Sequence, residues 1–184
     1  MTGNSREQND FELLQLEPSF DITKEQLEER QRDLSKVLHP DRFVSAPPGQ
    51  RRAALGQAIA VNDAVRRLKD PVYRGNLLLS CKFGAPDDAP MAAPELLMEV
   101  MELREQLAAA RSQGSGAEVD RLSQKVYMRR GQLLTELSDR FERLAQLDSQ
   151  QRGALIEALR TKLGELRYLE RFVEEVDRVL DDVS

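Results

Sequence analysis

Hydrophobic residues recur every three or four positions along almost the whole chain, the interval that places them on one face of an α-helix. The first half of the chain shows this pattern in four segments, over about residues 9–16, 24–38, 48–69 and 71–83. The second half shows it in three longer segments, over about residues 94–111, 117–147 and 149–181. The pattern therefore predicts an all-α protein without a substantial sheet.

Residues with capping preferences mark several of the predicted helix ends. Thr23 and Gln26 have the spacing of a capping box. The pair Asp70-Pro71 offers an N-cap followed by a first-turn proline. Gly84 is expected to close the fourth helix, and Asp148 to cap the last one.

The second and third helices carry apolar residues at helical spacing, which we expect to pack together. These residues, with one asparagine among them, are Leu27, Leu34, Val37, Leu38, Leu55, Ala58, Ile59, Val61, Asn62, Val65 and Leu68.

Composition divides the chain into four parts. Residues 1–8 are predicted to be a disordered lead, and residues 9–83 a compact helical unit. Residues 84–94 hold three prolines in eleven positions, which is typical of a semi-rigid linker. Residues 95–184 are predicted to be a three-helix bundle, because short loops between long helices make neighbours antiparallel.

Charge and rare residues restrict the possible functions. The net charge of −5 argues against general nucleic-acid binding, which needs a concentrated basic face. Cys81 and His39 are the single residues of their kinds, so an internal disulfide and the usual zinc sites are excluded, and we expect no cofactor. No stretch resembles a signal peptide or a membrane span, so the cytoplasm is the expected location.

The tripeptide His39-Pro40-Asp41 interrupts the helical pattern of the first half. Proline disfavours the helical conformation at the residue before it, so the second helix should end near His39. We expect irregular chain from there until a new helix begins near Pro48. Residues 24–69 should therefore form a helical hairpin whose tip carries an imidazole, a rigid ring and a carboxylate.

Two interpretations of this tip need no binding partner. In the first, His39 acts as a general base and Asp41 orients it, but no nucleophile signature accompanies them. In the second, His39 only ends a helix and Asp41 only begins a turn. The tripeptide follows a basic helix with Arg32 and Lys36 on one face. This arrangement is less expected by chance than the tripeptide alone.

The first helix of the predicted bundle has two apolar faces. Leu96, Val100, Leu103 and Leu107 lie within about 40° of one another on a helical wheel and form the expected core stripe. The side chains that point away from this stripe, or border those that do, are Leu97, Met98, Met101, Glu102 and Glu105. One face suffices for a bundle, so the second face is either covered by another part of the chain or available to a partner protein.

The first unit resembles a J-domain, the module that docks on a DnaK-type chaperone ATPase and stimulates its ATP hydrolysis. The resemblance is carried by Arg32 and Lys36 and by the segment Leu38-His39-Pro40-Asp41-Arg42-Phe43. It continues in the segments Ile59-Ala-Val-Asn62-Asp-Ala64 and Asp70-Pro71-Val-Tyr-Arg74-Gly-Asn-Leu77-Leu-Leu79.

The whole chain, over about residues 10–180, resembles the HscB or Jac-type co-chaperones of iron–sulfur cluster biogenesis. The matching segments are Leu97-Met98-Glu99-Val100-Met101-Glu102-Leu103-Arg104-Glu105 and Leu166-Arg167-Tyr168-Leu169. Leu38 departs from the aromatic residue that is common before the tripeptide, and Met101 replaces a usual leucine. The family resemblance implies a protein without a metal of its own.

The resemblance also implies two partners and assigns residues to each. A DnaK/HscA-type chaperone ATPase would contact Arg32, Lys36, His39, Pro40, Asp41 and Arg42. An IscU-type iron–sulfur scaffold would contact Leu97, Met98, Met101, Glu102, Glu105 and Tyr168. The alternatives are a J-domain protein whose bundle binds another client or self-associates, and a small enzyme that uses His39 and Asp41.

Overall fold

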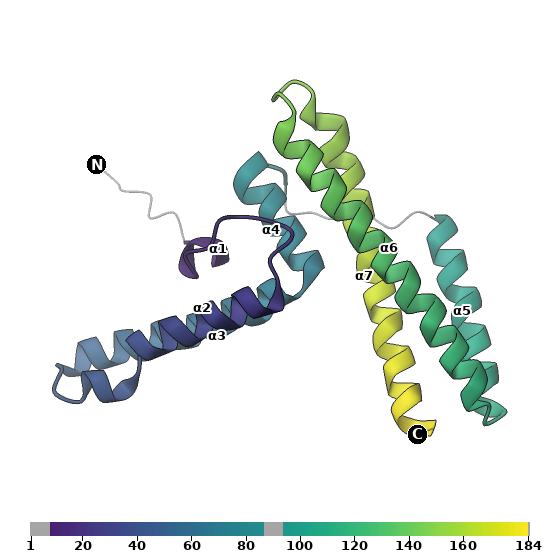
Figure 1. The fold of residues 1–184 in the computed structure, drawn as a ribbon, viewed down its shortest axis with the longest axis horizontal. Helices are drawn as coiled ribbons and strands as arrows, with labels where there is room; N and C mark the ends of the chain where they lie inside the picture. The colour runs from purple at the N-terminus through teal and green to yellow at the C-terminus, as the bar shows by residue number, and fades with distance from the viewer. Residues whose placement is uncertain (1–7, 87–93, 184) are drawn as a thin grey trace. The chain divides into compact units, whose positions relative to one another are not determined.

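The computed structural model describes residues 8–86 and 94–183, and every regular element in these residues is helical, as the hydrophobic pattern predicts (Figure 1). The chain divides into two compact units, Met1–Ala85 and Pro86–Ser184. The predicted lead falls almost entirely outside the described residues, and so does most of the predicted linker.

The first unit is built on a helical hairpin. Its elements are α1 (Asp10–Leu13), α2 (Lys24–Val37), the 3₁₀ turn η1 (Pro40–Phe43), α3 (Pro48–Lys69) and α4 (Pro71–Phe83). The helices α2 and α3 pack against each other and form the hairpin, while α1 and α4 also pack on α3 (Figure 1). The unit has the helical hairpin that the resemblance to a J-domain predicts.

Three of the four caps predicted from the sequence are present. The Thr23 side chain accepts the Gln26 backbone N–H, and the Gln26 side chain accepts the Thr23 backbone N–H, which completes the capping box. The Asp70 side chain accepts the Val72 N–H at the start of α4. Gly84 closes α4 with φ of 68°, a left-handed conformation that favours glycine.

The prediction that apolar residues of α2 and α3 pack together is wrong near the tip of the hairpin, the end that carries His39. Val37, Leu55 and Ile59 are exposed by 55%, 59% and 54%, and Asn62 is exposed as well. The small Ala54 and Ala64, which the sequence did not single out, are buried instead. Among the described elements, α2 and η1 border α3 near the tip, whereas α1 and α4 cover its other end. The apolar residues near the tip therefore keep helical spacing but have no further helix to cover them.

The segment after His39 is more ordered than expected. The prediction of irregular chain between residues 39 and 48 is wrong for Pro40–Phe43, which forms the 3₁₀ turn η1. Proline suits the first position of such a turn because its φ is already helical and its missing N–H needs no partner there.

The second unit is a three-helix bundle of α5 (Pro94–Ser112), α6 (Gly116–Gln146) and α7 (Arg152–Val183), joined by short loops. The two long helices α6 and α7 lie side by side over most of their length, and α5 packs against both (Figure 1). The prediction that Asp148 caps the last helix is wrong, since α7 begins at Arg152 after a turn in which the Gln151 N–H bonds to the Asp148 carbonyl.

The core stripe predicted for α5 is confirmed. Leu96, Val100, Leu103 and Leu107 are all at most 7% exposed. They attach α5 to the two long helices, and Val126 of α6 and Leu169 of α7 lie beside Leu96, Val100 and Leu103. No helix among the described residues is long and apolar enough to cross a bilayer.

A buried carboxylate ties α1 to α3 and α4. Asp10 accepts two hydrogen bonds from Arg67, at 2.7 and 2.6 Å, and one from the Tyr73 hydroxyl at 2.9 Å. Burial alone would raise the pKa of Asp10, but these hydrogen bonds and the Arg67 charge together lower it below the ordinary value of 3.8. The network therefore stabilises the fold in full at pH values above the ordinary pKa of 3.8, and this contribution is lost as the pH falls through the lowered pKa of Asp10.

We expect Asp10→Ala to destabilise the first unit by about 2–3 kcal/mol, because Arg67 and Tyr73 would lose their shared acceptor in a partly buried site. Urea unfolding followed by circular dichroism measures the change. Asp41→Ala is the matched control, since its carboxylate is 85% exposed and its removal should change stability by less than about 0.5 kcal/mol. Equal effects of the two variants would contradict this role of Asp10.

Candidate protein-interaction surfaces

The His39-Pro40-Asp41 loop is held in one conformation by its own side chain. His39 is the N-cap of η1, and its Nδ1 accepts the Asp41 backbone N–H at 3.3 Å. The Asp41 Oδ2 lies 3.5 Å from the same nitrogen. The side chains of His39 and Asp41 are 58% and 85% exposed, so the loop presents both to solvent on a fixed turn.

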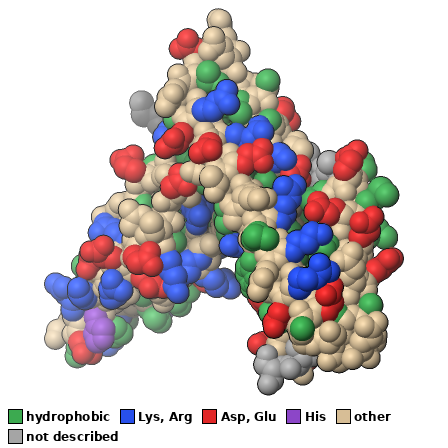
Figure 2. All heavy atoms as spheres, turned by 45° about the vertical axis from the view of Figure 1, so that its right-hand side comes forward, with side chains coloured by type: hydrophobic (Ala, Val, Ile, Leu, Met, Phe, Trp, Pro, Cys, Tyr) green, Lys and Arg blue, Asp and Glu red, His purple; other side chains and the backbone are tan. Residues whose placement is uncertain are grey.

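The last two turns of α2 add a cationic surface beside this loop. Arg32, Lys36 and His39 line one open groove together with Gln31 and Ser35. Both cations are exposed, in agreement with the prediction that they share a face. Figure 2 shows the single histidine on the molecular surface next to Lys and Arg side chains.

Most of the positive charge here is available to a partner. Lys36 forms an ion pair with Asp33 at 3.1 Å, but both side chains are at least half exposed, so water screens the pair. Arg32 and Arg42 form no ion pair with any residue that the structure describes. A mostly uncompensated cationic patch of this kind attracts an acidic protein surface.

The same geometry gives little support to catalysis. His39 and Asp41 stand on an exposed tip rather than in an enclosed pocket, where burial would tune their acid–base chemistry. Within the described part of the chain, no group of three His, Cys, Asp or Glu residues is arranged to hold a metal ion.

The second apolar face of α5 is exposed in the bundle. Met98 and Met101 are 65% and 60% exposed, and Leu97 is half-buried. Glu102 and Glu105 are exposed on the same side of the helix. The bundle therefore leaves this face open, in contrast to the interpretation in which another bundle helix covers it.

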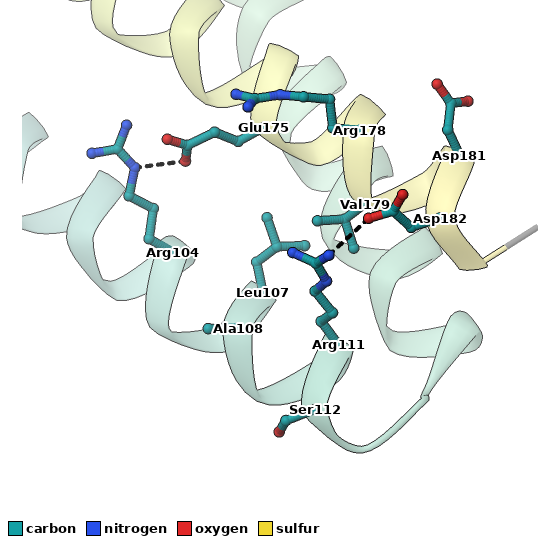
Figure 3. A pocket seen from close by; sticks show the side chains of 10 residues that line it. All are labelled: Arg104, Leu107, Ala108, Arg111, Ser112, Glu175, Arg178, Val179, Asp181 and Asp182. Atoms are coloured by element: carbon teal, nitrogen blue, oxygen red, sulfur yellow. Dashed lines mark hydrogen bonds and ion pairs between the residues drawn. The ribbon is translucent and has the colours of Figure 1, made fainter.

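The register between α5 and α7 brings Tyr168 to this face. Arg104 of α5 bonds to Glu175 of α7 and Arg111 bonds to Asp182, both at 2.8 Å (Figure 3). Each step is seven residues, or about two turns, in the same direction on both helices, so α5 and α7 run parallel. One further step of seven places Leu97 level with Tyr168, which is half-buried.

Five of the six residues assigned to the scaffold surface lie on α5, with Tyr168 of α7 level with Leu97. In the other unit, the six residues assigned to the ATPase surface lie on the last two turns of α2 and on the turn that follows it. The structure also shows residues that the sequence analysis missed. Met128 of α6 is 65% exposed and lines a groove with Leu96 and Val100 of α5. The sequence could have indicated Met128, because this methionine does not belong to the apolar stripe that α6 buries.

Comparisons with known proteins identify relatives of both units. Residues 92–177 match the family model described as the HSCB C-terminal oligomerisation domain. A co-chaperone HscB homologue of Neisseria gonorrhoeae is 36% identical over 134 residues, which are 71% of this chain and 80% of that protein. The homologue of Neisseria meningitidis serogroup C is 43% identical over 105 residues, or 55% of this chain, and only 63% of that protein's length is covered.

Solved structures agree with the fold of the whole chain. The chaperone HscB from Vibrio cholerae is 30% identical, with a TM-score of 0.78 over 96% of this chain and 99% of that one. Human co-chaperone protein HscB, at 24% identity and a TM-score of 0.76 over 94% of this chain and 82% of that one, shares the fold.

We expect Met98→Ala with Met101→Ala to change the unfolding free energy by less than about 0.5 kcal/mol, because neither side chain packs in the core. Leu103→Ala should cost about 2–4 kcal/mol, since Leu103 is 5% exposed and its truncation leaves a cavity. Urea unfolding of the three proteins checks the difference. A large loss in the methionine variant would show that this face is packed rather than free.

Proposed function

The chain belongs to the HscB co-chaperone family, and from this premise we propose that it stimulates ATP hydrolysis by a DnaK/HscA-type chaperone and delivers an IscU-type iron–sulfur scaffold to it. The observation that carries the proposal is the exposed His39-Pro40-Asp41 turn, which follows the exposed cations Arg32 and Lys36 in the last two turns of α2. In this role the protein assists the maturation of iron–sulfur proteins and performs no chemistry of its own.

The ATPase surface comprises Arg32, Lys36, His39, Pro40, Asp41 and Arg42. Its cations steer the unit toward an acidic patch on the ATPase. His39 caps the turn and Pro40 holds its backbone, so the Asp41 carboxylate is presented with little conformational freedom left to lose. A charge-assisted hydrogen bond from Asp41 to a cationic group of the ATPase is the expected specific contact.

The scaffold surface comprises Leu97, Met98, Met101, Glu102, Glu105 and Tyr168. Its centre is apolar and adaptable, because methionine side chains are flexible and polarizable. The glutamates border this centre and are exposed, which favours a partner with cationic groups around an apolar patch.

The two surfaces lie in different units of one chain. A scaffold held by the bundle is therefore delivered to the ATPase at a high effective concentration, without any new contact between the partners. Hydrolysis itself belongs to the ATPase. This division explains why neither surface needs an enclosed pocket.

A second function for the bundle is self-association. The matched family model is described as an oligomerisation domain, and the exposed Met98 and Met101 offer an apolar contact. Sedimentation at several protein concentrations separates the two functions. A stable dimer that excludes the scaffold would favour self-association, and a monomer that binds the scaffold would favour delivery.

We expect His39→Gln to abolish stimulation of the ATPase while scaffold affinity stays unchanged, because the substitution removes the ring that caps the turn but leaves the bundle intact. Steady-state ATP hydrolysis by a DnaK/HscA-type partner, with and without the IscU-type scaffold, measures the first effect. Calorimetric titration with the scaffold measures the second. Full stimulation by the variant would contradict the assignment of the loop to the ATPase surface. Loss of both stimulation and scaffold binding would indicate misfolding.

We expect the reverse from the combined variant Leu97→Ala, Met98→Ala and Tyr168→Ala. Scaffold affinity should fall at least about tenfold, the usual effect of removing buried interface anchors, while scaffold-independent stimulation of the ATPase remains. The same two assays apply. Unchanged scaffold affinity would rule out this face as the binding surface.

A further inference from the structure

We propose that the scaffold's binding site does not end on α5 but continues across the groove between α5 and α6 to Lys125, Met128 and Arg129. The occupant of this groove is an apolar side chain of the scaffold with a carboxylate beside it. The inference rests on the proposed function, since it enlarges the same site, and it adds a basic component to a surface that is otherwise apolar and acidic.

The position of Met128 is the first support. Its side chain is 65% exposed, as much as that of Met98 on α5. The groove that it lines also contains Leu96, Glu99 and Leu103, which bracket Met98 and Met101 along α5. The three exposed thioethers therefore lie at the same level of the bundle.

The groove has the size and lining of a side-chain site. Its volume is about 190 Å³. An engineered protein cavity of about 150 Å³ accepts benzene, so this space accommodates one apolar side chain. Its apolar lining comes from both helices and includes Val100, Leu103 and Val126, whose own side chains are almost fully buried.

Charge identifies what would flank that side chain. Lys125 and Arg129 line the groove, and neither makes an ion pair with a described residue, although Glu99 lines the same groove. Glu102 and Glu105 on the outer face of α5 are likewise without an ion pair among the described residues. A partner with complementary charge therefore places cations against Glu102 and Glu105 of α5 and a carboxylate against Lys125 and Arg129 of α6.

Interface size favours the larger site. A stable protein–protein interface involves about 20–30 residues on each side. The six residues of the scaffold surface fall well short of that number. The groove offers an exposed apolar extension through Met128, whereas the other large exposed hydrophobic residue of α6, Tyr127, has its hydroxyl engaged by Asp177 of α7.

Oxidation of the methionines in the wild-type full chain tests the site directly. Dilute hydrogen peroxide converts exposed methionine to its sulfoxide, and tryptic peptides separate Met128 from Met98 and Met101. With saturating IscU-type scaffold, we expect oxidation of all three side chains to be suppressed. Protection of Met98 and Met101 without Met128 would overturn the extension and leave the proposed function standing.

Two further outcomes of the footprint are informative. If the scaffold binds but protects none of the three methionines, or fails to bind at all, both the proposed function of the bundle and the extension fall. If Met128 becomes protected as the concentration of the free chain rises, a second copy occupies the groove and the extension to the scaffold is overturned.

Substitutions measure how much the groove contributes. We expect Met128→Ala to weaken scaffold binding about tenfold, and Lys125→Glu with Arg129→Glu to weaken it at least as much. The matched controls are Leu55→Ala, an apolar residue of the first unit that is 59% exposed, and Arg143→Glu, an exposed cation about 22 Å further along α6. Both should bind normally. Normal binding by the groove variants would overturn the proposal even if the α5 variant fails to bind.

Discussion

The burial of one apolar stripe per helix is the constraint on which both units depend. A helix in a hairpin or a three-helix bundle has neighbours on one side only, so it can bury about one face. In α5 that face is the stripe from Leu96 to Leu107, and it attaches the helix to the α6–α7 pair. Because the stripe suffices for attachment, Met98 and Met101 contribute little to folding. Their presence on the surface is consistent with the proposed binding of a partner.

A proline determines the local structure at the tip of the first unit. Pro40 prevents α2 from continuing and starts the turn η1, while His39 caps that turn with its imidazole. The loop thereby becomes an ordered projection whose charged groups are already in place. The Asp10 network at the other end of the hairpin holds α1, α3 and α4 together. The Asp10 network and the proposed ATPase surface therefore lie at opposite ends of the hairpin.

Much of the candidate site follows from residue types and spacing, but its extent does not. The two faces of α5 can be read from positions 96–107, because helical spacing assigns faces within a single helix. The position of Met128 beside α5 cannot be read in this way, since it depends on which turn of α6 lies beside Leu96 and Val100. The level of Tyr168 relative to Leu97 similarly becomes clear only from the ion pairs between α5 and α7. Distances between helices are set by packing rather than by periodicity.

By itself, the sequence determined the helices, most of their ends and the core stripe of α5, because caps, prolines and three-to-four spacing act over a few residues. It also ended α2 near His39, although it did not show that Asp41 lies in the 3₁₀ turn η1. The tertiary structure decided which apolar residues are covered. Leu55 and Ile59 keep helical spacing but lie where no second layer reaches α3, and α7 begins at Arg152 rather than beside Asp148. Burial depends on which neighbouring elements are present, and this is information that no single helix contains.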